Sequence, residues 1–494
     1  MPLDPRTPVI VGVGQRNQRV DDPLESLTPA DFIAEAVRDA AADAGLSSLA
    51  AVDSVRVVSF LSWRYRDPAR FIAASLGISP REKCITTNGG NSPQSLVNTT
   101  ALDIMAGRND VVVLCGGETS RTRKRARAAG IDLPWPEVPE DVAPDRVIGE
   151  ELVMNHEIET SRKIWAPVQV YPMFETAIRA KAGRTPEAHM EHLGRLWSKF
   201  SEVAAANPHA WLRKALTPEE IRTVGPRNRM IGLPYPKLMN SNNDVDQSAS
   251  IIMCSVEAAE RLGIARDRWV FPLAGSDCHE HKYVSERWEF TETPAIALAG
   301  KRVLELAGTS IADIDIVDLY SCFPSAVQLG AAALGLSLDR QLTRTGGLPF
   351  AGGPWNNYVM HAIATVVTEL RARPGEKGLV WANGGYATKH AFGVYSTEPS
   401  AHGFRHDYPQ AQIDALPRRT PVGIGDSEGP GTIEAYTVMH DRDGAPERAI
   451  ASVRLPDGGR AWGTSEDASV GAAMCEGEWV GRGVRLDREG NLLI

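Results

Sequence analysis

The sequence predicts an α/β protein that carries a small all-β domain near its C-terminal end. Short apolar strands alternate with helices over most of residues 6–415, which is typical of a parallel or mixed sheet with helices on its faces. From about residue 430 the apolar residues alternate with period two instead. With 494 residues, the chain is long enough for roughly three folding units.

The first strand and helix are marked by glycine, proline and apolar spacing. Residues 8–14 are almost wholly apolar and end in glycine, as expected of a strand buried on both faces. Thr28 is expected to cap the next helix, with Pro29 at its first position and Gly45 at its end. The same reasoning predicts further strands at residues 55–60, 111–115, 315–319 and 378–382, and further helices at residues 67–76, 92–107 and 355–371.

Two segments interrupt this alternation. Residues 119–239 are rich in Arg, Trp, Pro and His and mostly helical in pattern, which indicates a helical insertion without a strong strand. A polar, proline-bearing stretch at residues 401–430 is expected to be a linker. Residues 430–494 then predict a five-stranded barrel of the oligonucleotide/oligosaccharide-binding (OB-like) type, whose Trp462 and Trp479 lean on the larger body or on a partner.

Composition excludes several classes of function. The formal charge of −9 and the pI near 5.8 argue against nucleic-acid binding, which depends on clustered Lys and Arg. No apolar run approaches the length of a membrane span, and the start of the chain lacks a secretory pattern. The six cysteines include no CxxC pair, so neither a disulfide scaffold nor a zinc site is expected. These features predict a cytoplasmic protein without a metal ion.

Several motifs, in order along the chain, resemble those of the thiolase superfamily. They are the opening strand 9–14, the helix before Gly107 with the strand ending Cys115-Gly116-Gly117-Glu118, the turn Asp246-Gln247-Ser248-Ala249, the segment Tyr320-Ser321-Cys322-Phe323, and the glycine-rich segment 346–354. The sequence is most similar to the sterol-carrier-protein-type thiolases, as a type 1 thiolase-like protein with an additional C-terminal domain. The resemblance covers roughly residues 6–415.

The resemblance implies a thiolase fold with two βαβαβαββ halves in five layers, α-β-α-β-α. The implied division is an N-terminal half at 1–118 and 240–285, the insertion at 119–239, a C-terminal half at 286–415 and the OB-like domain at 430–494. It further implies an acyltransferase-family protein of lipid metabolism that handles coenzyme A thioesters, with CoA or acyl-CoA as ligand and no covalently bound cofactor. Both a monomer and a homodimer are compatible with it.

The catalytic residues of the family are absent at the matching positions. A thiolase uses a cysteine nucleophile, a histidine that activates it and a second cysteine as acid and base. The resemblance places these at Gly90 (or Asn91, if the register slips by one), Gly353 and Ala382. Because none of these side chains can perform the chemistry, we expect no ordinary acetyl-CoA acetyltransferase activity.

Tyr320 suggests a second possible function, that of a lyase. Tyr320 stands where the family holds a histidine, and tyrosines replace the cysteines in the sterol-aldolase branch of the family. Tyr320, with Cys322 and Tyr386, could then support retro-aldol cleavage of a β-hydroxyacyl-CoA, which needs a base and an oxyanion donor. In the competing interpretation, Tyr320 only fills the volume of an inactive site.

Two clusters of charged residues are further candidates for ligand-binding sites. Arg121, Arg123, Lys124, Arg125 and Arg127 form a basic run that either holds the phosphates of CoA or is a solvated helix face. The run Cys278-His279-Glu280-His281 could direct at most two ligands to one point, which argues against a metal site.

Three functions therefore stay open. The first is CoA-thioester binding without Claisen chemistry, and the second is the tyrosine-assisted lyase. The third is a non-catalytic interaction or lipid-binding protein, in which the C-terminal domain docks a protein partner.

Overall fold

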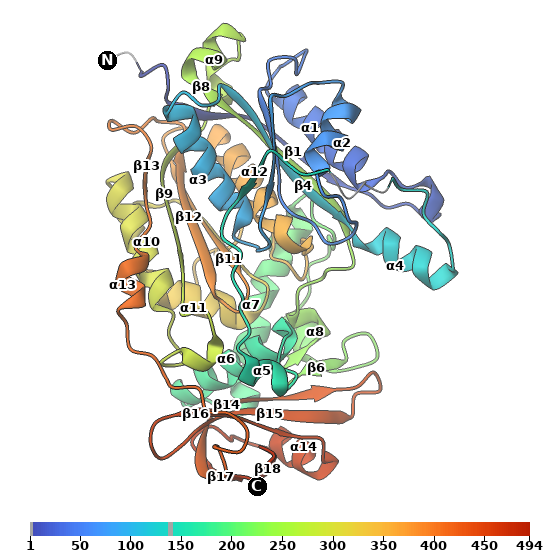
Figure 1. Cartoon of the computed structure of the whole chain (residues 1–494), viewed down its shortest axis with the longest axis vertical. Coiled ribbons are helices and arrows are strands. Elements are labelled where there is room, and N and C mark those ends of the chain that lie inside the picture. Colours follow the sequence, from blue (N-terminus) through green and yellow to red (C-terminus); the bar gives the residue numbers. More distant parts are fainter. Residues whose placement is uncertain (1–2, 137–141) are drawn as a thin grey trace.

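The computed structural model describes residues 3–136 and 142–494, which form two α/β halves and a C-terminal β domain (Figure 1). The first half is built on a six-stranded sheet in the order β1-β8-β4-β2-β3-β5. β2 pairs in parallel with β3 and β4, whereas β8 is antiparallel to both β1 and β4. The strands are β1 (Pro8–Asn17), β2 (Ser54–Val57), β3 (Glu82–Thr86), β4 (Val111–Thr119), β5 (Arg146–Ile148) and β8 (Asp246–Ser255).

The second half is built on a five-stranded sheet in the order β10-β11-β12-β9-β13. Its strands are β9 (Phe271–His279), β10 (Ile316–Leu319), β11 (Lys377–Gly384), β12 (Lys389–Ser396) and β13 (Arg405–Asp407). The positions of β9 and β13 differ from the predicted division of the chain. β9 falls in the range 240–285 assigned to the first half but pairs with β12 in the second sheet, and β13 falls in the predicted linker. β9 was missed because its polar residues, which include Ser276 and Asp277, break up the apolar run.

The helices form three layers around the two sheets, which confirms the expected α-β-α-β-α order. α1 and α2 cover the outer face of the first sheet, α3 and α12 pack against both sheets, and α10 with α11 covers the second sheet. Their bounds are α1 (Pro29–Asp43), α2 (Pro68–Leu76), α3 (Ser92–Met105), α9 (Val256–Arg261), α10 (Pro294–Ala307), α11 (Pro324–Leu334), α12 (Tyr358–Ala372) and α13 (Gln410–Asp414).

Local sequence signals explain where α1 begins. The Thr28 hydroxyl accepts a hydrogen bond from the Asp31 amide at 3.1 Å, and Pro29 follows at the first helical position. Such a cap stabilises a helix by about 1 kcal/mol. The apolar stripe that includes Phe32, Ile33 and Val37 is fully buried against the sheet. The predicted start of this helix is therefore confirmed.

The insertion is helical, as predicted, but it also supplies short strands to both neighbouring sheets. Its helices are α4 (Ser120–Ala129), α5 (Glu157–Ser161), α6 (Pro167–Lys181), α7 (Pro186–Ala206) and α8 (Pro218–Arg222), and its later strands are β6 (Met230–Gly232) and β7 (Tyr235–Pro236). β5 pairs in parallel with β3 and covers that edge of the first sheet. Strands of two or three residues carry too little periodicity to be seen in the sequence.

The C-terminal domain is an antiparallel sheet, as the period-two pattern predicts. Its strands are β14 (Gly429–His440), β15 (Pro446–Arg454), β16 (Arg460–Ser465), β17 (Gly483–Leu486) and β18 (Leu492–Leu493), and β6 pairs with β14 at one position. A single bridge between Thr464 and Asn491 joins the two ends of the sheet. The all-strand description was wrong in one respect, because α14 (Ala468–Cys475) is a helix. Closure into a barrel stays a prediction.

The C-terminal domain is anchored on the second half by one of the two tryptophans singled out in the sequence. The Trp462 indole donates a hydrogen bond to the Ser285 hydroxyl at 2.8 Å and packs edge-on against Phe290. Trp479 behaves differently, because its indole bonds to the carbonyl of Ala473 within the domain itself, at 3.0 Å. Docking on the larger body is therefore confirmed for Trp462, whereas the Trp479 indole bonds within its own domain and its contact with a partner stays a prediction.

Candidate functional site

Four segments from distant parts of the chain meet at the amino-terminal end of α3. The Gly89 amide donates a hydrogen bond to Asn356 Oδ1 at 3.1 Å, and the Tyr320 amide donates to the Trp381 carbonyl at 3.1 Å. Gly90 lies against the Asn383 carbonyl and the Tyr320 ring. The structure therefore brings together Gly90, Tyr320 and the end of β11, as the motif order along the sequence predicts.

Gly90 has no room for a side chain. A Cβ atom on Gly90 would lie 2.5 Å from the Tyr320 hydroxyl oxygen, 2.9 Å from the adjacent ring carbon, and closer still to the Asn383 carbonyl. Real Cβ atoms do not approach other atoms so closely. The Tyr320 ring thus occupies the space in which a nucleophilic side chain at residue 90 would begin.

Polar side chains crowd Gly353, and Ala382 is buried within its strand. A Cβ on Gly353 would overlap the Ser241 hydroxyl and lie 2.8 Å from Asn243 Oδ1. Ala382 is fully buried in β11, where it pairs with Ala391 of β12. Neighbouring polar side chains fill the space in which an imidazole at residue 353 would have to fit.

Burial keeps Tyr320 and Cys322 protonated at neutral pH. Tyr320 is 8% exposed, and burial raises the pKa of its phenol well above 10. Burial likewise raises the pKa of the Cys322 thiol to about 12, although the nearby Tyr171 hydroxyl opposes this. Neither group is therefore a base or an anionic nucleophile near pH 7, but the Tyr320 hydroxyl can donate a hydrogen bond.

Tyr386 does not point at Tyr320, and a tyrosine of the insertion occupies the neighbouring space. The Tyr386 hydroxyl donates to Asn155 Oδ1 at 3.2 Å. The Tyr171 hydroxyl accepts from Asn383 Nδ2 at 2.8 Å and donates to the Gly385 carbonyl at 3.0 Å. Tyr171 escaped the sequence analysis because it belongs to no motif. Its only signal was its helical spacing from the buried Phe174.

Comparison with known proteins identifies the family. A solved structure described as a monomeric SCP2-thiolase-like protein type 1 from Mycobacterium smegmatis is 33% identical, covers 100% of both chains and superposes with a TM-score of 0.84. The chain belongs to the SCP2-thiolase-like proteins of type 1. Residues 410–491 also match the family model for the additional C-terminal domain of thiolase-like protein type 1.

More distant relatives share the thiolase-like fold. A solved Ltp2-ChsH2(DUF35) aldolase is 19% identical, with a TM-score of 0.58, and the match covers 79% of this chain and 98% of that one. The acetyl-CoA acetyltransferase of Methanothermobacter thermautotrophicus is 23% identical over 218 residues, which span 39% of this chain. The match covers 55% of that curated relative, so this chain spans about half of its length.

The basic run of this thiolase-like protein does not form one cationic face. Lys124 is paired with Asp244 at 2.8 Å, and Arg125 donates to the carbonyls of Val20 and Asp21. Arg123 and Arg127 are exposed on another side of α4, which projects from the body (Figure 1). Only Arg121 lies toward the glycine-rich segment, through its position beside Trp211.

A second arginine joins Arg121 at Trp211. The Arg19 guanidinium lies 3.9 Å from the centre of the Trp211 ring and the Arg121 guanidinium 5.9 Å from it. Burial and the positive charge of Arg121 lower the pKa of Arg19. The Trp211 amide bonds to the Ala351 carbonyl at 2.8 Å, so both cations lie beside the segment that ends at Gly353. Sequence analysis missed Arg19 because it lies about 100 residues before the basic run.

Two negative findings apply to the described residues. None of the helices in ranges 3–136 and 142–494 combines the length and apolar character that a membrane crossing requires. Within the same ranges, no three His, Cys, Asp or Glu side chains are placed to share a metal ion.

The closed packing at Gly90 gives a stability prediction. Gly90→Ala is expected to lower the free energy of unfolding by about 1–3 kcal/mol, because its new methyl group overpacks the contact with Tyr320 and Asn383. Adding Tyr320→Phe is expected to recover part of this loss, since the hydroxyl is the nearest side-chain atom. Denaturant unfolding of the single and double variants measures the coupling. Gly225→Ala, at a position with open space, is the matched control and should not destabilise. Equal stability of the two glycine variants would contradict the prediction.

Proposed function

We propose that this protein binds a coenzyme A thioester without performing thiolase chemistry. The observation that carries the proposal is a pair of arginines at Trp211 that have no ion-pair contact among the described residues, beside the segment in which thiolases hold their histidine. In the described part of the chain, neither Arg19 nor Arg121 has a carboxylate in an ion pair. Two like charges at one ring repel each other, and a bound phosphate would relieve that repulsion.

The packing at the substituted positions supports the second part of the proposal. Gly90, Gly353 and Ala382 offer no nucleophile, no imidazole and no acid–base thiol, and the Asn383 carbonyl and Tyr320 leave no space for a side chain at Gly90. Tyr320 stays protonated at neutral pH. A bound thioester would therefore meet hydrogen-bond donors but no group able to take over its acyl chain.

Calorimetric titration with free CoA tests the proposal. We expect saturable binding that Arg121→Ala weakens by about tenfold to a hundredfold, as expected for the loss of a charged hydrogen bond. The effect should shrink as salt is raised, because the ligand is an anion. Lys124→Ala is the control on the same helix, since its ammonium is already paired with Asp244. If neither free CoA nor acyl-CoA gives a heat of binding, CoA binding is refuted. That result would favour the non-catalytic interaction protein.

One observation favours the lyase as the second candidate. The Tyr320 hydroxyl stands at the start of α3, where a catalytic side chain of this fold would act, and the similar Ltp2-ChsH2(DUF35) protein is an aldolase. With its phenol protonated, Tyr320 would donate to the enolate oxygen, and another group would have to take the β-hydroxyl proton. Release of an aldehyde or ketone from a β-hydroxyacyl-CoA, lost in Tyr320→Phe, would establish this function.

A further inference from the structure

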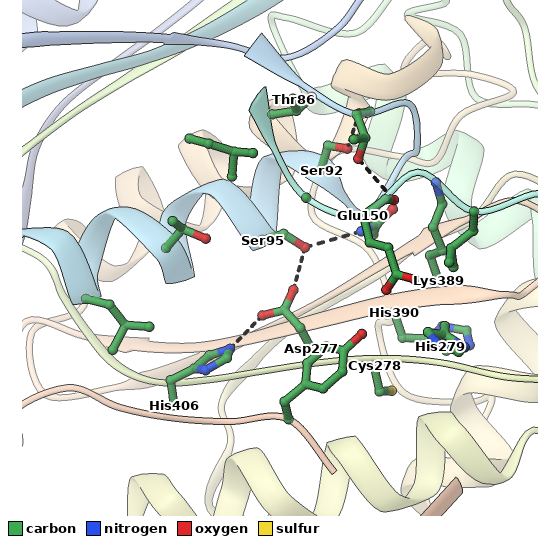
Figure 2. A pocket seen from close by; sticks show the side chains of 18 residues that line it. Thr86, Ser92, Ser95, Glu150, Asp277, Cys278, His279, Lys389, His390 and His406 are labelled. Atoms are coloured by element: carbon green, nitrogen blue, oxygen red, sulfur yellow. Dashed lines mark hydrogen bonds and ion pairs between the residues drawn. The ribbon is translucent and has the colours of Figure 1, made fainter. Parts of the chain in front are cut away.

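A cavity of about 260 Å³ opens between α3, β9, β12 and the loop that follows β5. Figure 2 shows its lining, which includes the hydroxyl groups of Ser92 and Ser95 and the side chains of Asp277, Lys389 and His406. Neither Tyr320 nor the Arg19–Arg121 pair lines it. The proposed CoA function therefore leaves this cavity without a role.

The Asp277 carboxylate of the cavity accepts three hydrogen bonds. Asp277 accepts hydrogen bonds from the Ser95 hydroxyl, from Asn98 Nδ2 at 2.7 Å and from His406 Nε2 at 2.7 Å (Figure 2). Because the carboxylate lies between the serine and the histidine, no histidine is placed to deprotonate the serine, and the trio is not a nucleophilic serine site. Three donors already share the negative charge of Asp277, and no ion pair joins it to Lys389.

Lys389 is a buried amine that no carboxylate of the described residues contacts, although Glu150 lines the same cavity. It is 5% exposed, and its Nζ donates to the Asn88 carbonyl. Among residues 3–136 and 142–494, no carboxylate oxygen lies within 4.0 Å of this amine nitrogen. Burial lowers the pKa of this amine, and the more distant charges of Glu151 and Glu150 oppose the change only in part. A larger fraction of the amine is therefore free base than in an exposed lysine.

A histidine is the cross-strand neighbour of this lysine on the same face of the sheet. Lys389 is directly opposite His279 in the antiparallel pair of β12 and β9, so both side chains extend from the same face of the sheet. His279 Nδ1 is 2.7 Å from the Glu280 carbonyl, which can only accept, and 3.3 Å from the Gln410 amide nitrogen. The shorter contact assigns the ring proton to Nδ1. In the neutral ring, the lone pair of Nε2 is then free to accept a proton and return it.

We propose that Lys389 is a reactive amine that captures a small aldehyde or ketone in this cavity as a Schiff base, with His279 carrying protons. The amine nitrogen attacks the carbonyl carbon, a C–N bond forms, and the C=O electron pair moves to oxygen. One amine proton passes through His279 Nε2 to that oxygen. The second amine proton is then transferred to the same oxygen. The C–O bond breaks, its electron pair leaves with the oxygen as water, and the nitrogen lone pair forms the C=N bond. No oxidant or reductant is consumed.

Reductive trapping on the full-length protein tests this site. Propanal with sodium cyanoborohydride converts an imine at lysine into a stable propylamine, which peptide mass mapping locates. At pH 7 we expect Lys389 to carry more label than Lys301, whose side chain is 77% exposed and serves as the internal reference. The Lys389→Arg variant should lose the label at residue 389 and keep that at Lys301. His279→Gln should slow labelling of Lys389 by about a hundredfold, the contribution of one positioned acid–base group.

Several outcomes would overturn the proposal. Less label on Lys389 than on Lys301 at pH 7 would mean that the amine is protonated or shielded from carbonyl compounds. Equal labelling rates in His279→Gln and the unsubstituted protein would remove the histidine from the step. Because the comparison of Lys389 with Lys301 needs no substitution, it holds even where a variant fails to fold. It is also independent of CoA titration, so the two proposals fail separately.

Discussion

Purified protein is expected to cleave acetoacetyl-CoA with free CoA no faster than a reaction without protein. Loss of a complete nucleophile–base unit lowers the rate of an enzyme by about a millionfold. By the motif resemblance, Gly90, Gly353 and Ala382 would stand at the three positions of that unit. Loss of the thioester enolate absorbance measures the reaction, and an active acetyl-CoA acetyltransferase assayed in the same buffer is the positive control.

Restoring the three side chains is expected to fail as well. In Gly90→Cys the new Cβ would lie 2.5 Å from the Tyr320 hydroxyl, and in Gly353→His it would overlap the Ser241 hydroxyl. The triple variant with Ala382→Cys should therefore be less stable and still inactive. Thiolysis by the unsubstituted protein, or its return in the triple variant, would show that the site is more open than these contacts allow.

Local signals were sufficient to predict much of the fold. Thr28 and Pro29 identify the start of α1, and the glycine-bounded apolar runs identify β1, β4 and β11. Among the strands that escaped prediction, β5 is very short, β9 and β12 contain polar residues that line the cavity, and β8 begins with the polar residues Asp246-Gln247-Ser248. A side chain that lines a cavity breaks the periodicity on which strand prediction depends.

The candidate site was predictable only in part, for a different physical reason. The loss of the nucleophile at Gly90 is visible in the sequence, whereas the filling of its space by Tyr320 depends on a contact between residues 230 positions apart. The five clustered cations suggested a single anion site, but a helix distributes neighbouring residues around its axis. As a result, Lys124 forms an ion pair with Asp244 and Arg125 donates to a backbone carbonyl. Arg121 instead lies beside Trp211, next to Arg19.

Arg460→Ala is expected to lower the free energy of unfolding by about 3–5 kcal/mol, because it breaks a buried ion pair and leaves Glu434 with only a longer, more exposed pair to Arg454. The Arg460 side chain is 1% exposed, and its Nε donates to Glu434 at 2.8 Å. Its Nη1 also donates to the carbonyls of Val284 and Ser285 at 3.1 and 3.3 Å, which ties β16 to the second half of the body. Loss of this residue should therefore loosen the docking of the C-terminal domain, which denaturant unfolding and the rate of proteolytic release of that domain both measure.

The chain supplies a matched control at the same glutamate. Arg454 also pairs with Glu434, at 3.6 Å, but its side chain is 48% exposed. Because solvent screens such a pair, Arg454→Ala should cost about 0–1 kcal/mol. A large loss in Arg460→Ala beside a small one in Arg454→Ala assigns the effect to burial and to the carbonyl contacts across the domain boundary. Similar losses in the two variants would mean that the C-terminal domain is held by its apolar contacts at Trp462 and Phe290, with the arginine contributing little.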